Sequence, residues 1–144
     1  GDELMIIHSE EGEFYSLQAI LSQSSPLNCS GMGKIFLSNF TDEELKRYFS
    51  QDFEKRTINT ITTLEQYLKE KPAIVERNLA YDHEEYEYGL SCISTGLYNG
   101  KNEVIAALSI SGPSSRLEHK GLEQLEKALL ETSQRISKKI QTVE

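Results

Sequence analysis

The stretch GLSCISTGLYNGKNEVIAALSIS, residues 89–111, carries the strongest fold signal in this chain of 144 residues. Its two halves, residues 89–99 and 103–111, are rich in apolar and β-branched residues, which favour strands. The Asn-Gly dipeptide at 99–100 is typical of a tight hairpin turn. We therefore predict an antiparallel β-hairpin here, with the side chains of each strand pointing alternately to its two faces.

The rest of the chain predicts helices and strands on both sides of this hairpin. Before it we expect a first hairpin of strands 2–9 and 13–21, a polar connection at 22–26, helices at 30–39, 41–50 and 63–78, an irregular segment at 51–62, and a strand at 79–83. After it we expect one long helix, 118–140, with Leu122, Leu125, Leu129, Ile136 and Ile140 as its buried stripe. This order predicts a single α+β domain, an antiparallel sheet with helices packed on it.

Two helix starts have specific capping signals. Thr41 is followed three residues later by Glu44, and Thr63 by Gln66, the pattern of a capping box. Pro72 lies inside the helix that begins near Thr63, and we expect it to kink or restart that helix because proline lacks the N–H.

Composition excludes some classes of function. The net charge of −8 and the lack of a basic stripe make the chain a poor DNA binder on its own. No apolar run approaches the roughly 18–20 residues of a membrane helix. Two cysteines do not make a disulfide framework, and a reduced, cytoplasmic protein is the simpler interpretation.

Several residues suggest chemistry, but each has a simpler interpretation. The P-loop pattern fails around Gly33-Lys34, because Asn28 and Ile35 stand where it needs Gly and Ser or Thr. Gly31 and Gly33 fit close packing better than anion binding, although both remain possible. The acidic run at 82–87 fits a solvated turn better than a metal or acid-base site, so we predict no metal and no cofactor.

The two thiols allow further hypotheses. Cys92 fits a small buried hydrophobe better than a nucleophile, because no motif gives it a His partner. Cys29 lies at a predicted helix start, where a thiol pKa can fall. A reversible disulfide between Cys29 and Cys92 is therefore a less favoured hypothesis, and it requires close Cα atoms.

Three segments go beyond composition: LNCSGMGKIFL at 27–37, AYDHEEYEYGLSCI at 80–93 and AALSISGPSSR at 106–116. Together with the Thr-Ile-Thr stretch at 60–62 they resemble the effector-binding domain of IclR-family transcriptional regulators. The resemblance covers about residues 2–141 in order, and its Ser-Gly-Pro-x-x-Arg ending is its most specific part.

The resemblance implies a GAF-like fold, a curved antiparallel sheet with helices on it and a pocket for a small metabolite. It implies that residues 1–144 form an effector-binding domain, that a winged helix-turn-helix absent from this chain carries DNA binding, and that the protein forms dimers or tetramers. By motif position, the implied effector-binding residues are Gly31, Met32, Asp82, Leu90, Cys92, Ser109 and Ser111. Ser109 and Ser111 are also expected to share one face of their strand.

This chain departs from the family pattern at three places, which puts the family's small 2-oxo acids in doubt as ligands. Asn28 stands where the family often has His, Met32 where it has a smaller residue, and Ser94-Thr95-Gly96 where it often has Ala-Ala-Pro. We predict a sensing domain and no enzyme. The alternatives are a small enzyme using Cys92 or the carboxylates of Asp82 and Glu85, and a dimerisation module with a vestigial pocket.

Overall fold

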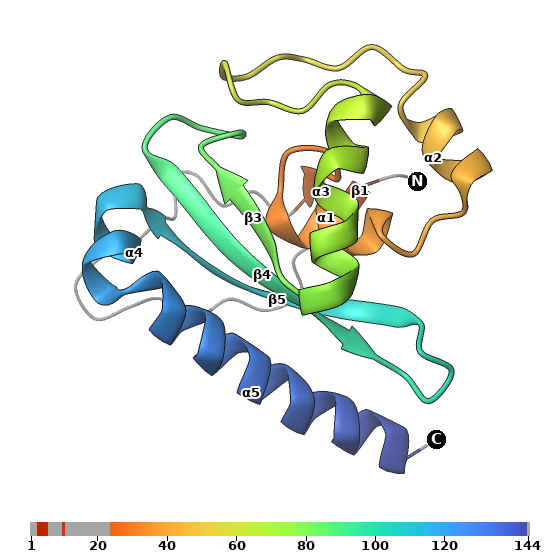
Figure 1. Cartoon of the computed structure of the whole chain (residues 1–144), viewed down its shortest axis with the longest axis vertical. Helices are drawn as coiled ribbons and strands as arrows, with labels where there is room; N and C mark the ends of the chain where they lie inside the picture. The colour runs from red at the N-terminus through yellow and green to blue at the C-terminus, as the bar shows by residue number, and fades with distance from the viewer. Residues whose placement is uncertain (1–2, 6–9, 11–23, 144) are drawn as a thin grey trace.

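A computed structural model describes residues 3–5, 10 and 24–143 of the chain. In this part a three-stranded antiparallel sheet, in the order β3-β4-β5, is covered by helices (Figure 1). Its strands are β3 (Ala80–His83), β4 (Leu90–Tyr98) and β5 (Val104–Pro113). The helices are α1 (Gly31–Leu37), α2 (Asp42–Tyr48), α3 (Leu64–Arg77), α4 (Ser114–Lys120) and α5 (Leu122–Thr142). The arrangement confirms the predicted α+β class.

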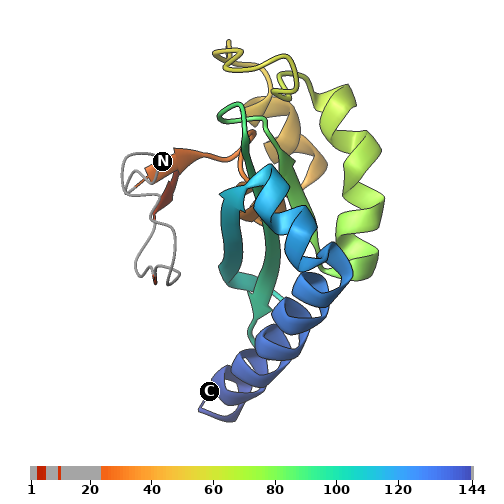
Figure 2. The same cartoon turned by 90° about the vertical axis from the view of Figure 1, so that its left-hand side faces the viewer.

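The two faces of the sheet pack against different helices. Strand register places Tyr81, Ile93 and Ile110 in one row across the three strands, and this face packs on Leu129 of α5. The next row, with Ala80, belongs to the opposite face, which packs on the apolar side of α1. Figure 1 shows α5 running alongside β4 and β5, and Figure 2 gives the same arrangement from the side.

Small residues let α1 lie close to β4. A Cβ atom added at Gly96 would lie 2.9 Å from Cγ2 of Ile35, and one added at Gly31 would lie 2.4 Å from Oγ of Ser94. Both distances are too short for a side chain, so glycine is needed at each contact. Close packing, the simpler of the two interpretations of Gly31, is therefore present.

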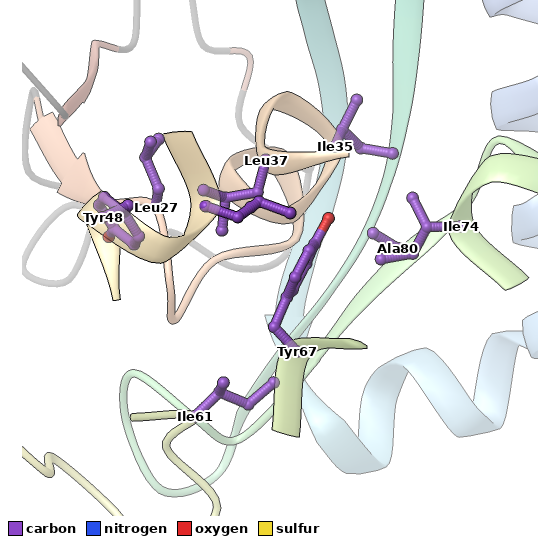
Figure 3. Packing of buried hydrophobic residues seen from close by; sticks show 9 residues of the cluster. Leu27, Ile35, Leu37, Tyr48, Ile61, Tyr67, Ile74 and Ala80 are labelled. Atoms are coloured by element: carbon purple, nitrogen blue, oxygen red, sulfur yellow. The ribbon is translucent and has the colours of Figure 1, made fainter. Parts of the chain in front are cut away.

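The core on the α1 side joins α1, α3 and β3. Figure 3 shows Tyr67 of α3 among the buried apolar side chains of this cluster. The Tyr67 ring is fully buried, and its hydroxyl donates to the backbone carbonyl of Lys34 at 2.9 Å. Burial raises the pKa of the Tyr67 phenol, so it remains a neutral donor.

The predicted helix starts and the hairpin turn are confirmed. Both capping boxes, at Thr41 and Thr63, form with the expected partners. The turn between β4 and β5 is closed by Asn99, whose side-chain oxygen accepts from the backbone N–H groups of Lys101 and Glu103 at 2.9 Å each.

Three predictions about elements were wrong. The long helix 118–140 is two helices, because Gly121 between α4 and α5 has a φ of 95°, which breaks a helix. Of the predicted stripe, Leu129 is buried but Leu122 is 40% exposed. Pro72 does not restart α3, which runs unbroken from Leu64 to Arg77, whereas the kink at Pro72 stays a prediction. Pro72 is exposed, so water can donate to the carbonyl that the missing N–H leaves without a partner.

The N-terminal prediction was wrong in part. Residues 24–26, expected within a polar connection, form strand β2 (Ser24–Pro26), which pairs with β1 (Glu3–Met5). Most of the predicted hairpin of residues 2–9 and 13–21 lies outside the described residues.

Candidate functional site

Four of the residues implied by the resemblance lie on one face of the sheet. Asp82, Cys92 and Ser111 stand opposite one another on three adjacent strands. Ser109 lies two residues before Ser111 on β5 and therefore points to the same side. We call these four residues the polar face. Leu90 lies two residues before Cys92, so it belongs to the same side and adds an apolar side chain.

Hydrogen bonds link three residues of the polar face. Sγ of Cys92 lies 3.0 Å from Oγ of Ser111, which lies 3.4 Å from Oγ of Ser109. All three side chains are half-buried. Burial first, and the nearby Asp82 carboxylate second, raise the pKa of the Cys92 thiol to about 12. Cys92 is therefore a neutral group at physiological pH, unsuited to be a nucleophile.

Asp82 is the buried carboxyl group of the polar face, with 2% of its surface exposed. One of its oxygens, Oδ1, accepts the backbone N–H of Glu85 at 2.7 Å. Burial raises the pKa of Asp82 to about 7, although that hydrogen bond acts in the opposite direction. Near neutral pH the group therefore exists in both forms, and its protonated form can donate one hydrogen bond.

The start of α1 faces this region of the sheet. Ser30 caps the helix: its side-chain oxygen accepts a hydrogen bond from the Gly33 N–H, and its backbone carbonyl accepts one from the Lys34 N–H. In the part of the chain that the structure describes, the N–H groups of Gly31 and Met32 donate to no acceptor of the protein. Gly31 is buried directly over Ser94, and Met32 is half-buried against the α1-side core.

A buried ion cluster adjoins the site, and the sequence did not predict it. Nζ of Lys34 is fully buried and donates to Glu85 and Glu70 at 2.8 Å each and to the Tyr81 carbonyl at 2.7 Å. Glu85 is 3% exposed, and its second oxygen, Oε1, has no hydrogen-bond partner among the described residues. The expected solvated turn at 82–87 was therefore wrong for Asp82 and Glu85, which are buried.

The structure gives no support to thiol reactivity. Cys29 and Cys92 are both free thiols, and burial raises the pKa of Cys29 to about 12 instead of lowering it. Within residues 3–5, 10 and 24–143, no three metal-binding side chains gather to hold an ion. None of the helices described there is long and apolar enough to cross a bilayer.

Two surface hollows among the described residues lie away from the polar face. They follow the exposed side of α5 and are lined mainly by charged side chains such as Arg77, Glu131 and Lys138. A solvated helix surface accounts for such hollows. The convergence of neutral donors on the sheet is the stronger indication of a ligand site.

Comparisons with known proteins agree with this geometry. The family model described as "Bacterial transcriptional regulator IclR C-terminal" matches residues 1–138. The DNA-binding transcriptional repressor YiaJ of Escherichia coli is 37% identical over 126 residues, which make up 85% of this chain and 45% of that protein. The chain thus spans about half the length of this relative.

Solved structures show the same fold. The crystal structure of transcriptional regulator YaiJ has a TM-score of 0.89 and 35% identity, covering 96% of this chain and 80% of that one. The inducer-binding domain of a double mutant of PobR from Acinetobacter, described in complex with 3-hydroxybenzoic acid, has a TM-score of 0.75 and 21% identity, covering 88% of this chain and 74% of that one. These matches confirm the GAF-like fold implied by the resemblance.

The matched proteins are regulators of transcription, and none of those described above is an enzyme. The family model spans nearly the whole chain, and the fold is the one that the resemblance implies. The chain therefore belongs to the IclR family of bacterial transcriptional regulators, whose C-terminal effector-binding domain it matches.

Proposed function

We propose that this domain binds a small organic anion between the polar face and the start of α1, and that the ligand controls transcription. One observation carries the proposal: three strands bring Asp82, Cys92 and Ser111 together on the side of the sheet that α1 covers. The effector-binding residues are Gly31, Met32, Asp82, Leu90, Cys92, Ser109 and Ser111.

The donors available favour an acid as the ligand. A carboxylate only accepts hydrogen bonds, and the site supplies two hydroxyl groups, a thiol and two backbone N–H groups. Protonated Asp82 adds one more donor. The ligand named for PobR, 3-hydroxybenzoic acid, carries both a carboxylate and a hydroxyl group, which supports this class of ligand for a protein of the same fold.

DNA binding belongs, in this proposal, to a winged helix-turn-helix outside the chain. The net charge of −8 disfavours direct contact with phosphates, and the chain spans only 45% of YiaJ. We further propose that the protein acts in the cytoplasm as a dimer or tetramer. Sedimentation of the isolated chain at tens of micromolar tests self-association. A titration with duplex DNA at physiological salt tests the expectation that the isolated chain does not bind DNA specifically.

The pair Ser109→Ala and Ser111→Ala tests the site. We expect the double variant to bind its acid roughly ten- to a thousandfold more weakly, because two donors to a charged group are lost. Its melting temperature without ligand should stay near that of the wild type. A thermal-shift screen of small carboxylic acids identifies the ligand, and calorimetry measures the affinity.

Ser115→Ala provides a matched control, since Ser115 is exposed on α4, outside the polar face. It should bind as the wild type does. A folded double variant with unchanged affinity would show that the ligand binds elsewhere.

A further inference from the structure

The outer side of α3 carries apolar side chains that the described residues leave exposed. Tyr67 and Ile74 are the buried residues of this helix and belong to the α1-side core. Leu68 and Val75, the next residue after each of them, are 44% and 61% exposed. Figure 2 shows α3 at the edge of the molecule, with the sheet on one side of it. The other side of α3 is therefore open to a partner.

The arrangement of these residues, more than their exposure, indicates an interface, since single exposed apolar residues are common on protein surfaces. Leu68 and Val75 are about two helical turns apart, so both lie along one edge of the outer side. Lys69 and Glu76, the residues after them, lie along the other edge, and both are exposed. Neither forms an ion pair within the described part of the chain. Pro72, also exposed, lies midway along the helix between the two pairs. We call these five residues the outer face of α3.

The outer face of α3 is complementary to itself. In a two-fold contact between antiparallel helices, a residue before the axis faces, along the same edge, the residue of the second copy that lies about equally far after the axis. With the axis at Pro72, Leu68 faces Val75 of the second copy, and Lys69 faces Glu76 of the second copy. Two parallel helices would instead place the apolar edge of one against the charged edge of the other. An unrelated partner would not require the two halves of α3 to match each other, so the pattern favours a second copy.

We propose that the outer face of α3 binds the same face of a second copy of this chain, with the two helices antiparallel. The inference rests on the self-association in the proposed function and names a surface for it. The contact covers both apolar side chains of each copy and forms two ion pairs, one on each side of the axis. Two helices of 14 residues bury an area at the low end of specific interfaces, below about 1,200 Å², so this contact alone makes a weak dimer.

Sedimentation equilibrium of the isolated chain, over roughly 10 µM to 1 mM, tests the proposal in the range of a weak dimer. The wild type should dimerise with a dissociation constant of roughly tens to hundreds of micromolar. Val75→Asp should weaken the dimer at least about tenfold, because it brings one charge from each copy into the apolar part of the contact. Val143→Asp is the matched control, since Val143 is 84% exposed at the end of α5. It should dimerise as the wild type does.

Charge reversal tests which residues face each other. Lys69→Glu should weaken the dimer roughly two- to thirtyfold, because two ion pairs become two repulsive contacts, and Glu76→Lys should do the same. The variant with both substitutions should dimerise like the wild type again, since the two charges are exchanged across the axis. Lys127→Glu, at an exposed position of α5, is the matched control and should have no effect. Melting temperatures near that of the wild type exclude unfolding as the cause of a lost dimer.

The possible outcomes separate this inference from the proposed function. A dimer that each charge reversal weakens and the double reversal restores supports the contact. Self-association that no α3 variant changes, or that the double reversal does not restore, overturns the inference but leaves the proposed oligomer in place. A wild type that stays monomeric at about 1 mM refutes both and leaves the outer face of α3 to another partner, such as the DNA-binding domain. Binding of a small acid should be equal in the wild type and the α3 variants, so failure of the proposed ligand site does not affect this test.

Discussion

Tyr81, Ile93 and Ile110 form one row on the α5 side of the sheet, whereas Asp82, Cys92 and Ser111 form the next row on the α1 side. The first row is apolar and packs on Leu129 of α5. The second is polar and only partly covered, with a carboxyl group of raised pKa. Neighbouring residues of the same strands thus serve different purposes.

This contrast separates the contributions to stability and to binding. The α5 side buries apolar surface, the dominant favourable term in folding. The α1 side buries a hydroxyl group without a partner and a carboxyl group, both of which cost free energy. Under the proposed function, a polar ligand would give such groups at inward-facing positions their hydrogen-bond partners.

The largest effect is expected on the α1 side, if ion pairing holds it together. Lys34→Met should reduce the free energy of unfolding by about 3–5 kcal/mol, because Glu85 would remain buried without its cation. Urea denaturation measures the change.

Lys46→Met is the matched control, since Lys46 is exposed on α2, and it should change stability by no more than about 0.5 kcal/mol. Adding Glu85→Gln to Lys34→Met should recover part of the loss. Equal stability of the two lysine variants would show that Lys34 contributes nothing through its charge.

The second-largest loss of stability is expected in the α5-side core, and it can be compared with the loss at a residue on the other face of the sheet. Ile93→Ala should reduce the free energy of unfolding by about 2–5 kcal/mol, because Ile93 is 1% exposed in the α5-side core. Ser109→Ala, one row away on the other face, should cost at most about 1 kcal/mol, the value of one hydrogen bond. Similar losses for the two variants, measured by urea denaturation, would contradict the division.

The smallest effect is the dependence of stability on pH that the buried carboxyl group of Asp82 contributes. The folded pKa of Asp82 is raised from 3.8 to about 7, so between these values the folded state holds a proton that the unfolded state releases. Stability should therefore fall as pH rises through this window, by at most about 1.4 kcal/mol per pH unit, and level off above it. The raised pKa of Glu85 acts in the same direction.

Asp82→Asn should flatten this part of the stability curve, because asparagine does not titrate. The comparison is made as the difference between the wild-type and variant curves from pH 4 to 8, which cancels other groups. The free energy of unfolding of the wild type minus that of the variant should fall as pH rises from 4 to 7. A difference that instead increases with pH over this range would refute the raised pKa. Lys34, Cys29 and Cys92 surround Asp82, and both thiols stay protonated over this range.

The sequence predicted the features that depend on neighbours along the chain. Alternation along 103–111 placed Ser109 and Ser111 on one face, and local capping signals located the starts of α2 and α3. Gly121 is also a local signal, but the apolar spacing around it favoured a continuous helix. The site residues came from resemblance, because no local pattern distinguishes a pocket serine from any other.

Long-range pairing accounts for what the sequence did not predict. Lys34 meets Glu70 and Glu85, which lie 36 and 51 residues further along the chain, so no spacing rule links them. Ser94 is unusual because Gly31 of α1 covers it and its hydroxyl group has no hydrogen-bond partner among the described residues, which depends on how α1 packs on β4. Both features became visible only when α1, α3 and the sheet were placed together.

The buried ammonium group of Lys34 also constrains the order in which the chain folds. Removing this charge from water is costly until both carboxylates are in place, and Glu85 arrives only with the turn between β3 and β4. We therefore expect the packing of α1 on the sheet to follow formation of that turn. The contact it depends on spans 51 residues, and such long-range contacts slow folding.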